Sequence, residues 1–177
     1  MNYFMSKIIP AVTAADNADD DVVFNWTVIP NNSSTTGQAV KLESACVLDM
    51  NDAGAFPMDL FFCRGSISGV TPAAPTAGQR LGAADDVVDI TVAEALAIDV
   101  FGCINMTISE GDLITGTTWT TTNIGLVMQP HPYTNNLYVA GVWRGDPATA
   151  GSKREGAGVG CEPGGRGTRR DQPVVFK

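Results

Sequence analysis

The sequence predicts an all-β protein: an antiparallel, jelly-roll-like β-sandwich with one short helix and an extended C-terminal arm rich in glycine and arginine. Three observations predict this class. Apolar side chains recur mainly with a period of two, the strand-like runs are short and regularly spaced between turn residues, and no 3.6-residue period is sustained. With 177 residues, 44% of them hydrophobic and 17% charged, the chain has the size and apolar content of one globular domain.

The first half of the chain supplies three strand patterns. Residues 22–28 alternate between apolar and polar side chains, and residues 40–48 repeat this alternation. Turn-forming residues at 51–54 lead into a third run at 58–62, so we expect the second and third runs to form a hairpin. A surface loop rich in proline, alanine and glycine is expected at 66–82.

The second half contains the one helical signal. Thr91 and Glu94 have the spacing of a capping box, so a helix of one or two turns is expected at 91–97. Strands are expected at 98–108, 124–128 and 137–143, with turn and edge residues at 115–122 and a short terminal strand at 173–176 that joins this sheet or that of a neighbour. The residues expected to form most of the core are Phe24, Trp26, Leu60, Phe62, Val139 and Trp143.

The charge divides the chain into an acidic body and a basic tail. The net charge is −8, from 11 Lys+Arg and 19 Asp+Glu. Residues 144–177 carry seven basic and four acidic side chains, a net of +3, and the rest carries four basic and fifteen acidic ones, a net of −11. Eight of the 19 glycines lie at 145–167, a density that favours extended backbone. We therefore divide the chain into an N-terminal extension at 1–20, a β-sandwich body at 21–147 and a C-terminal arm at 148–177.

An acidic protein of this kind is repelled by nucleic acid and by anionic membranes, so neither is expected as a direct partner. No apolar run reaches the length of a membrane span, and residues 1–10 lack the features of a signal peptide. We expect synthesis in the cytoplasm, with translation starting at Met1 or Met5.

Catalytic motifs are missing from the sequence. The nearest approach to a nucleophile elbow, at 65–69, has Ile67 where a serine is required. The one histidine, His131, lies between Pro130 and Pro132 and is expected to be solvent-exposed or at an interface rather than to act as a general base. We therefore expect neither enzymatic activity nor a cofactor.

The cysteines and carboxylates do not have the spacing of metal ligands. No C-x-x-C pair is present, so Cys46, Cys63 and Cys103, which lie in apolar strand-like runs, are expected to be buried free thiols. Whether these residues or Cys161 form a disulfide stays open. The aspartates at 19–21 and 85–89 lack the ligand spacing of a calcium loop, so no metal is expected.

The arm is expected to bind a protein partner. Its arginines can form charge-assisted hydrogen bonds with an acidic surface, and its terminal strand can add to a sheet edge. The loop around His131 and Tyr133 is expected to provide further contacts. The residues expected to bind a partner are Arg154, Arg166, Arg169, Arg170, Pro173, Val174, Val175, Phe176, His131 and Tyr133.

Several segments resemble small structural proteins of tailed-bacteriophage virions. Residues 123–128 (NIGLVM) and 137–147 (LYVAGVWRGDP) look like the closing hairpin of these proteins, in which a GLVL strand pairs with an LYVAGVSRGTP strand. Residues 44–62, with the run VLDMNDAGAFPMDLFF, are similar to their LLDKDDQGAALDLVFF hairpin, and residues 90–102 resemble a further element. The C-terminal arm lies outside the resemblance.

The resemblance implies a non-enzymatic virion protein, made in the host cytoplasm and located on the capsid exterior as a decoration, or cement, protein. Its partners would be the major capsid protein and further copies of itself, in a homotrimer or another homo-oligomer. Two alternatives stay open. One is a neck, tail or fibre protein whose loops at 31–36 and 117–122 face a receptor; the other is a carbohydrate-binding β-sandwich, which predicts exposed aromatic platforms.

Overall fold

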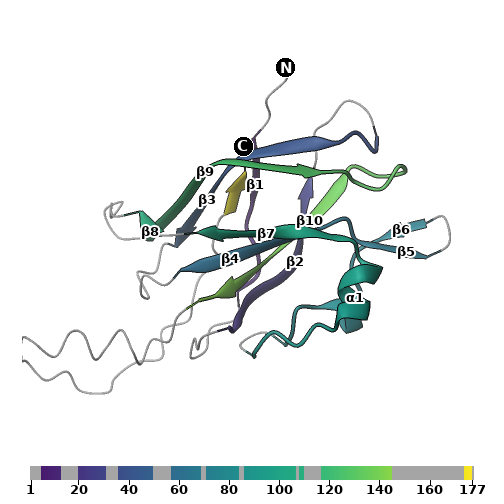
Figure 1. Ribbon diagram of the computed structural model, residues 1–177, viewed down its shortest axis with the longest axis horizontal. Coiled ribbons are helices and arrows are strands. Elements are labelled where there is room, and N and C mark those ends of the chain that lie inside the picture. The colour runs from purple at the N-terminus through teal and green to yellow at the C-terminus, as the bar shows by residue number, and fades with distance from the viewer. Residues whose placement is uncertain are drawn as a thin grey trace, which may run out of the picture.

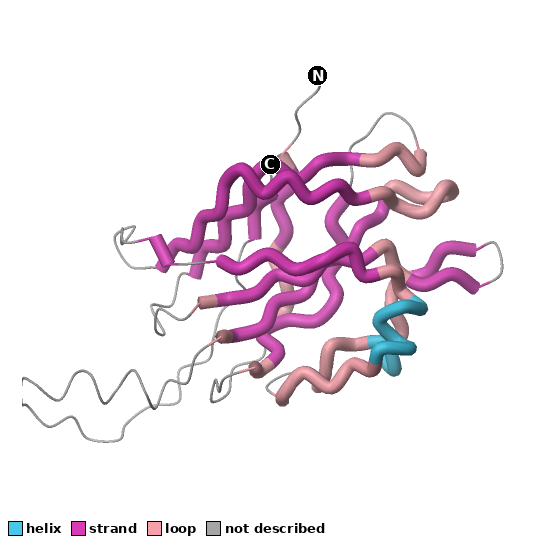
Figure 2. The backbone as a smooth tube through the Cα atoms, viewed as in Figure 1, coloured by secondary structure: helices cyan, strands magenta, loops and turns pink. Residues whose placement is uncertain are grey.

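The computed structural model shows two packed β-sheets with a helical segment at one end (Figure 1). It describes residues 5–12, 20–30, 36–49, 57–68, 71–83, 86–106, 108–109, 117–144 and 174–176. Strands make up most of this part of the chain, and the helix stands beside loop segments at one end of the sandwich (Figure 2). The all-β class and the antiparallel sheets predicted from the sequence are confirmed.

Each sheet is antiparallel. One has five strands, in the order β1 (Ser6–Ile8), β11 (Val174–Phe176), β3 (Val40–Asp49), β9 (Thr117–Met128) and β8 (Ile108–Ser109). The other has four, in the order β2 (Val22–Pro30), β10 (Asn136–Trp143), β4 (Met58–Cys63) and β7 (Val100–Met106). A separate hairpin, β5 (Ser66–Ser68) with β6 (Thr71–Ala73), is followed by the short 3-10 helix η1 (Ala77–Gln79) and by α1 (Val92–Ala97).

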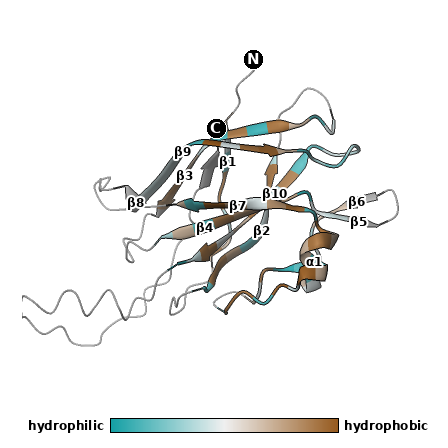
Figure 3. Ribbon diagram, in the orientation of Figure 1, coloured by the Kyte–Doolittle hydropathy of each residue, from teal (hydrophilic) through white to brown (hydrophobic). Residues whose placement is uncertain are grey.

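The inward faces of the two sheets form the main core. Alternation along the strands places Val47 of β3 and Phe62 of β4 in this core with no exposed surface, as expected for strands with one buried face. Trp119 of β9 and Trp143 of β10 meet across the interior, with ring centroids 5.9 Å apart. Bands of apolar and polar residues alternate along β3 in Figure 3.

The strand pairings are nested within one another. β2 pairs with β10, β3 with β9, and β4 with β7, so the chain resembles one long hairpin that has been rolled until its halves form two layers. This nested winding is the jelly-roll arrangement that the sequence predicts. It also brings β10 between β2 and β4 at the centre of the four-stranded sheet.

A second layer covers the outer face of the four-stranded sheet. Leu81 packs there with Val22 and Val142, so β10 is buried on both faces from Leu137 to Trp143. Two side chains of β2 hold the covering segment: Trp26 Nε1 donates to the carbonyl oxygen of Gln79 (2.7 Å), and the Asn25 amide bonds the backbone of residues 81 and 82. This explains why Trp26 is half-buried, whereas the other five predicted core residues are fully buried.

Four predictions about the elements are corrected. The loop expected at 66–82 contains the β5–β6 hairpin and η1. The runs at 40–48 and 58–62 do not form a hairpin, and those at 124–128 and 137–143 do not pair either, because in both cases the chain crosses from one sheet to the other. The turn and edge residues expected at 115–122 are replaced, from Thr117 onward, by the first half of the continuous strand β9.

The predicted helix is confirmed as α1, with Thr91 as its N-cap. The Thr91 hydroxyl accepts from the Glu94 backbone N–H (3.2 Å), and the Glu94 carboxylate accepts from the Thr91 N–H (2.8 Å). None of the six helical residues is buried, so these reciprocal bonds, rather than core packing, define where the helix begins.

Candidate docking site at the edge of the five-stranded sheet

The C-terminal strand β11 lies inside a sheet rather than beside it. Its three residues pair on one side with Ala45–Val47 of β3 and on the other with Ser6–Ile8 of β1. We call the position between these two segments the strand slot. The yellow strand in Figure 1 occupies it. Among the described strands, β11 is the one that pairs with β1 in a sheet, and β2 contributes a side-chain hydrogen bond, from the Ser6 hydroxyl to the Pro30 carbonyl oxygen (2.9 Å).

The residues lining the slot differ between its two faces. Ala45 and Val47 of β3 are buried, as is Ile8 of β1, so this face continues the core. Cys46 points to the opposite face, where it is half-buried and accepts a weak hydrogen bond from the Thr120 hydroxyl (3.8 Å). The register places Lys7, Val175 and Cys46 in one row across the strands.

Of the residues predicted to bind a partner, Val174, Val175 and Phe176 are therefore brought to one sheet edge. Arg154, Arg166, Arg169, Arg170 and Pro173 lie outside the described residues. The N-terminal extension expected at 1–20 includes β1, which shares the slot with the C-terminal strand.

The body also holds the chain firmly at the point where the arm begins. The backbone N–H of Arg144 donates to the carbonyl oxygen of Pro57 (2.8 Å), and the Nε of the Arg144 side chain donates to Oδ2 of Asp59 (2.7 Å). The same guanidinium forms an ion pair with Asp20, while Asn105 donates to the other oxygen of Asp59 (2.9 Å). Sequence reasoning counted Arg144 only as tail charge. The one available signal was Asp59, a carboxylate within an otherwise apolar strand.

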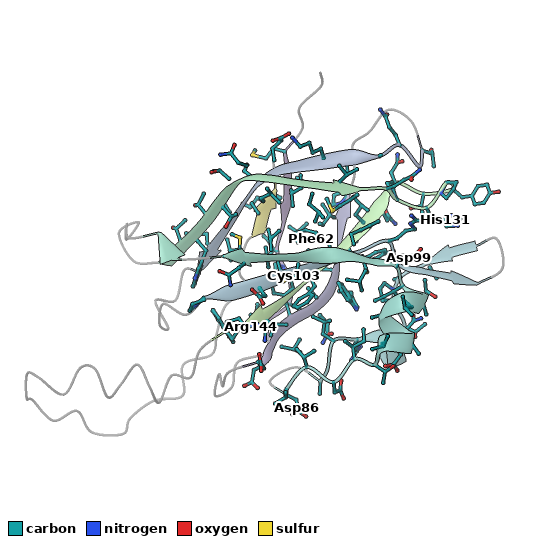
Figure 4. All side chains as sticks on the ribbon, viewed as in Figure 1. Phe62, Asp86, Asp99, Cys103, His131 and Arg144 are labelled. Carbon is teal, nitrogen blue, oxygen red and sulfur yellow. The ribbon has the colours of Figure 1, made fainter. Side chains whose placement is uncertain are left out.

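The loop at the other end of the sandwich differs from its prediction. Arg144 and His131 lie toward opposite ends in Figure 4. His131 is only 7% exposed, so the first of its two expected environments, exposure to solvent, is wrong, and the second, an interface, stays a prediction. Its Nδ1 accepts from the Tyr133 N–H (3.4 Å) and its ring lies 5.3 Å from that of Tyr133. Tyr133 itself is 68% exposed. His131 thus supports the loop, and Tyr133 provides the surface.

Gly37, in the neighbouring turn, packs closely against the backbone of this loop. It adopts a positive φ of 73°, and a Cβ at this position would come within 2.7 Å of the Pro132 backbone. Glycine is therefore required at this close approach.

The thiols are free but not uniformly buried. Cys63 is buried, Cys46 is half-buried and Cys103 is exposed, which corrects the expectation of three buried thiols. Burial raises the pKa of Cys63 to about 12. Desolvation, together with the negative charge and hydrogen bond of Asp59, raises the pKa of Cys103 to about 12 as well. Cys161 lies outside the described residues.

Within the described ranges, no three His, Cys, Asp or Glu side chains lie close enough together to hold a metal ion. In the same part of the chain, no helix has the length and apolar character needed to span a membrane. Neither a protein-family model nor a curated protein sequence matches this chain.

Proposed function

We propose that the protein is a bacteriophage virion structural protein that decorates the outer capsid and stabilises the shell. The observation that carries this proposal is the position of β11. A basic, glycine-rich segment of sequence ends in a strand that is inserted between two others, so the sheet accommodates a strand delivered at the end of a long arm. An arm that docks by strand pairing suits a protein that joins neighbouring subunits.

The charge distribution supports the same role. A tail of +3 and a remainder of −11 attract one another, and the acidic body avoids direct binding to nucleic acid. The contacts of Arg144 with Asp59 and Asp20 support it further, because they fix the last described residue before the arm at one defined end of the body.

The mechanism requires no chemical turnover. A protein that binds the assembled lattice, but not the free subunits, adds its binding free energy to the stability of the shell. In a homotrimer or another homo-oligomer, several bodies and arms would engage the major capsid protein together, so that release of one contact would be followed by rebinding.

The test is a binding assay on capsids assembled without this protein, from the phage whose genome encodes it. The full chain is compared with a chain truncated after Pro147 and with a variant in which Arg166, Arg169 and Arg170 are replaced by glutamine. We expect binding to saturate, with the number of bound copies per capsid at saturation proportional to the number of capsid subunits. Truncation should weaken binding most, and the glutamine variant should weaken it mainly at low salt.

Failure to bind the shell, with the protein found at low copy number in necks or tails, would favour the alternative of a neck, tail or fibre protein. One loop invoked for that alternative, at 117–122, belongs to β9 and pairs with β3, so it cannot act as a receptor-facing loop. The other, at 31–36, lies almost wholly outside the described residues. The carbohydrate-binding alternative requires an exposed aromatic platform, and Tyr133 is the one strongly exposed aromatic side chain among the residues whose exposure the structure describes.

A further inference from the structure

The two ends of the arm lie near the same end of the sandwich. Val174 pairs with Val47, and Val47 pairs with Trp119 of the next strand. Trp119 in turn packs against Trp143, one residue before the chain leaves the body at Arg144. With strands about 4.8 Å apart and sheets about 10 Å apart, the gap between Trp143 and Val174 is about 15 Å.

The sequence that connects these ends is far longer than the gap. Twenty-nine residues, 145–173, separate Arg144 from Val174. Fully extended, a chain of this length spans about 95 Å, whereas connections between neighbouring elements commonly need only about 2–6 residues. The surplus exceeds the diameter of the body, which is about 40 Å for a domain of this size. A connection of this length is thus long enough to reach a second copy as well as its own sheet.

We propose that the C-terminal strand is exchanged between copies, so that β11 of one chain fills the strand slot of a neighbour. The partner is thus a second copy of this chain, recognised by backbone pairing to Ala45–Val47 and Ser6–Ile8. The sheet of each copy is then completed by the other, because β1 is paired with no other strand of its sheet within the described residues.

The concentration of neighbouring copies decides whether β11 fills the slot of its own chain or that of a neighbour. The backbone pairing is the same whether the strand comes from its own chain or from a neighbour, so the contacts favour neither. A tether of this kind gives its own strand an effective concentration on the order of 1 mM, and exchange prevails when neighbouring copies are more concentrated than that.

The register provides a direct test. Val175 and Cys46 are register partners on antiparallel strands, and residues directly opposite each other on such strands have Cα atoms within the separation that a disulfide requires. Two proteins are prepared in a Cys103→Ser, Cys161→Ser background. The first keeps Cys46 and has no further change; the second carries Val175→Cys together with Cys46→Ser and an affinity tag.

The two proteins are unfolded together, refolded at about 1 mM or above and oxidised. A disulfide between them can form only if the strand of one chain lies in the slot of the other. We expect a disulfide-linked heterodimer on non-reducing gels. The matched control replaces Val175→Cys with Val174→Cys, which is in register with Val47 instead of Cys46 and should lose the heterodimer.

Two outcomes would overturn the proposal. If no heterodimer forms but a single chain with Cys46 and Val175→Cys closes a disulfide internally, the slot is filled only within one chain. If neither cross-link forms, β11 does not occupy the slot at all. Exchange needs no capsid, so these results are independent of whether the protein decorates one.

Discussion

At the scale of single residues, Gly141 allows an aromatic ring to pack against the centre of β10. A Cβ at this position would lie 2.4 Å from Cε1 of Phe24, whose side chain is buried in the core. We therefore expect Gly141→Ala to destabilise the fold by about 1–3 kcal/mol, measured by chemical denaturation. Gly102→Ala is the matched control. Its Cβ would make one ordinary contact, with Leu126 at 3.5 Å, and a similar loss there would contradict the explanation.

Arg144 makes a second prediction at this scale. Its partner Asp59 has a side chain only 14% exposed, so removing the guanidinium leaves a poorly solvated carboxylate with one described donor fewer. Arg144→Gln should cost about 1–2 kcal/mol in the free energy of unfolding. Lys41→Gln removes the exposed pair with Glu43 and should change stability by less than about 0.5 kcal/mol. Equal effects would mean that the Arg144 pair is no more than a surface contact.

Cys103 should react slowly although it is exposed. The thiolate is the reactive form, and desolvation and the Asp59 carboxylate hold the pKa of this thiol at about 12. Asp59→Asn removes the negative charge, which lowers that pKa and should accelerate alkylation at pH 8, followed by mass spectrometry. The control is Asp99→Asn. The charge of Asp99 acts on Cys63 and not on Cys103, so this substitution should leave the alkylation rate of Cys103 unchanged.

At the scale of elements, the start of α1 is sensitive to pH. Hydrogen bonds from the Thr91 hydroxyl and backbone N–H lower the pKa of Glu94 below its ordinary value of 4.5. Because this pKa is lowered, the Glu94 carboxylate stabilises the helix fully at pH values above 4.5. The stabilisation is lost as the pH falls through the lowered pKa of the folded protein. We expect the protection of the Glu94 amide from hydrogen exchange to fall in acid.

Two variants test this cap. Thr91→Val removes the hydroxyl, so the Glu94 pKa, followed by carboxyl NMR, should return toward its ordinary value. Glu94→Gln keeps a side-chain acceptor without the charge, so the amide protection should become independent of pH. A Glu94 pKa unchanged by Thr91→Val would contradict the capping explanation.

The elements also show what sequence patterns can and cannot predict. The strand at 137–143 is a continuous apolar run, and β10 is buried on both faces. Alternation identified the strands at 22–28, 40–48 and 58–62, because each has one face in the main core. It did not identify their partners, since alternation fixes which face is buried but not which strand lies alongside. The threonines at 117–122 were misjudged as turn and edge, although β-branched side chains favour strands.

The candidate site was only partly accessible to sequence reasoning. A terminal strand at 173–176 was predicted, but its place between β1 and β3 depends on pairing across more than 100 residues, which no local pattern encodes. His131 was misplaced for a related reason. Flanking prolines indicate a loop, but they do not show whether that loop folds back against the turn at Gly37.

At the scale of the whole molecule, removal of the arm should open one edge and leave the rest folded. A chain truncated after Pro147 lacks β11, so β1 loses its described sheet neighbour and Ala45–Val47 becomes an open edge. Hydrogen exchange should accelerate at residues 6–8 and 45–47 but not in β4 or β10. A synthetic peptide of residues 171–177 should restore protection. Uniform acceleration would mean that β11 supports the whole sandwich.

The pairing of β1 with β11 also affects the order in which the protein is made. Ile8 and its partner Val174 are separated by 166 positions, so β1 leaves the ribosome roughly ten to thirty seconds before its neighbour is synthesised. During that interval the nested strands can close, while the slot at the sheet edge stays empty. The slot can therefore be filled only after the nested strands have had time to close, and adjacent ribosomes on one messenger hold other nascent chains with the same open slot.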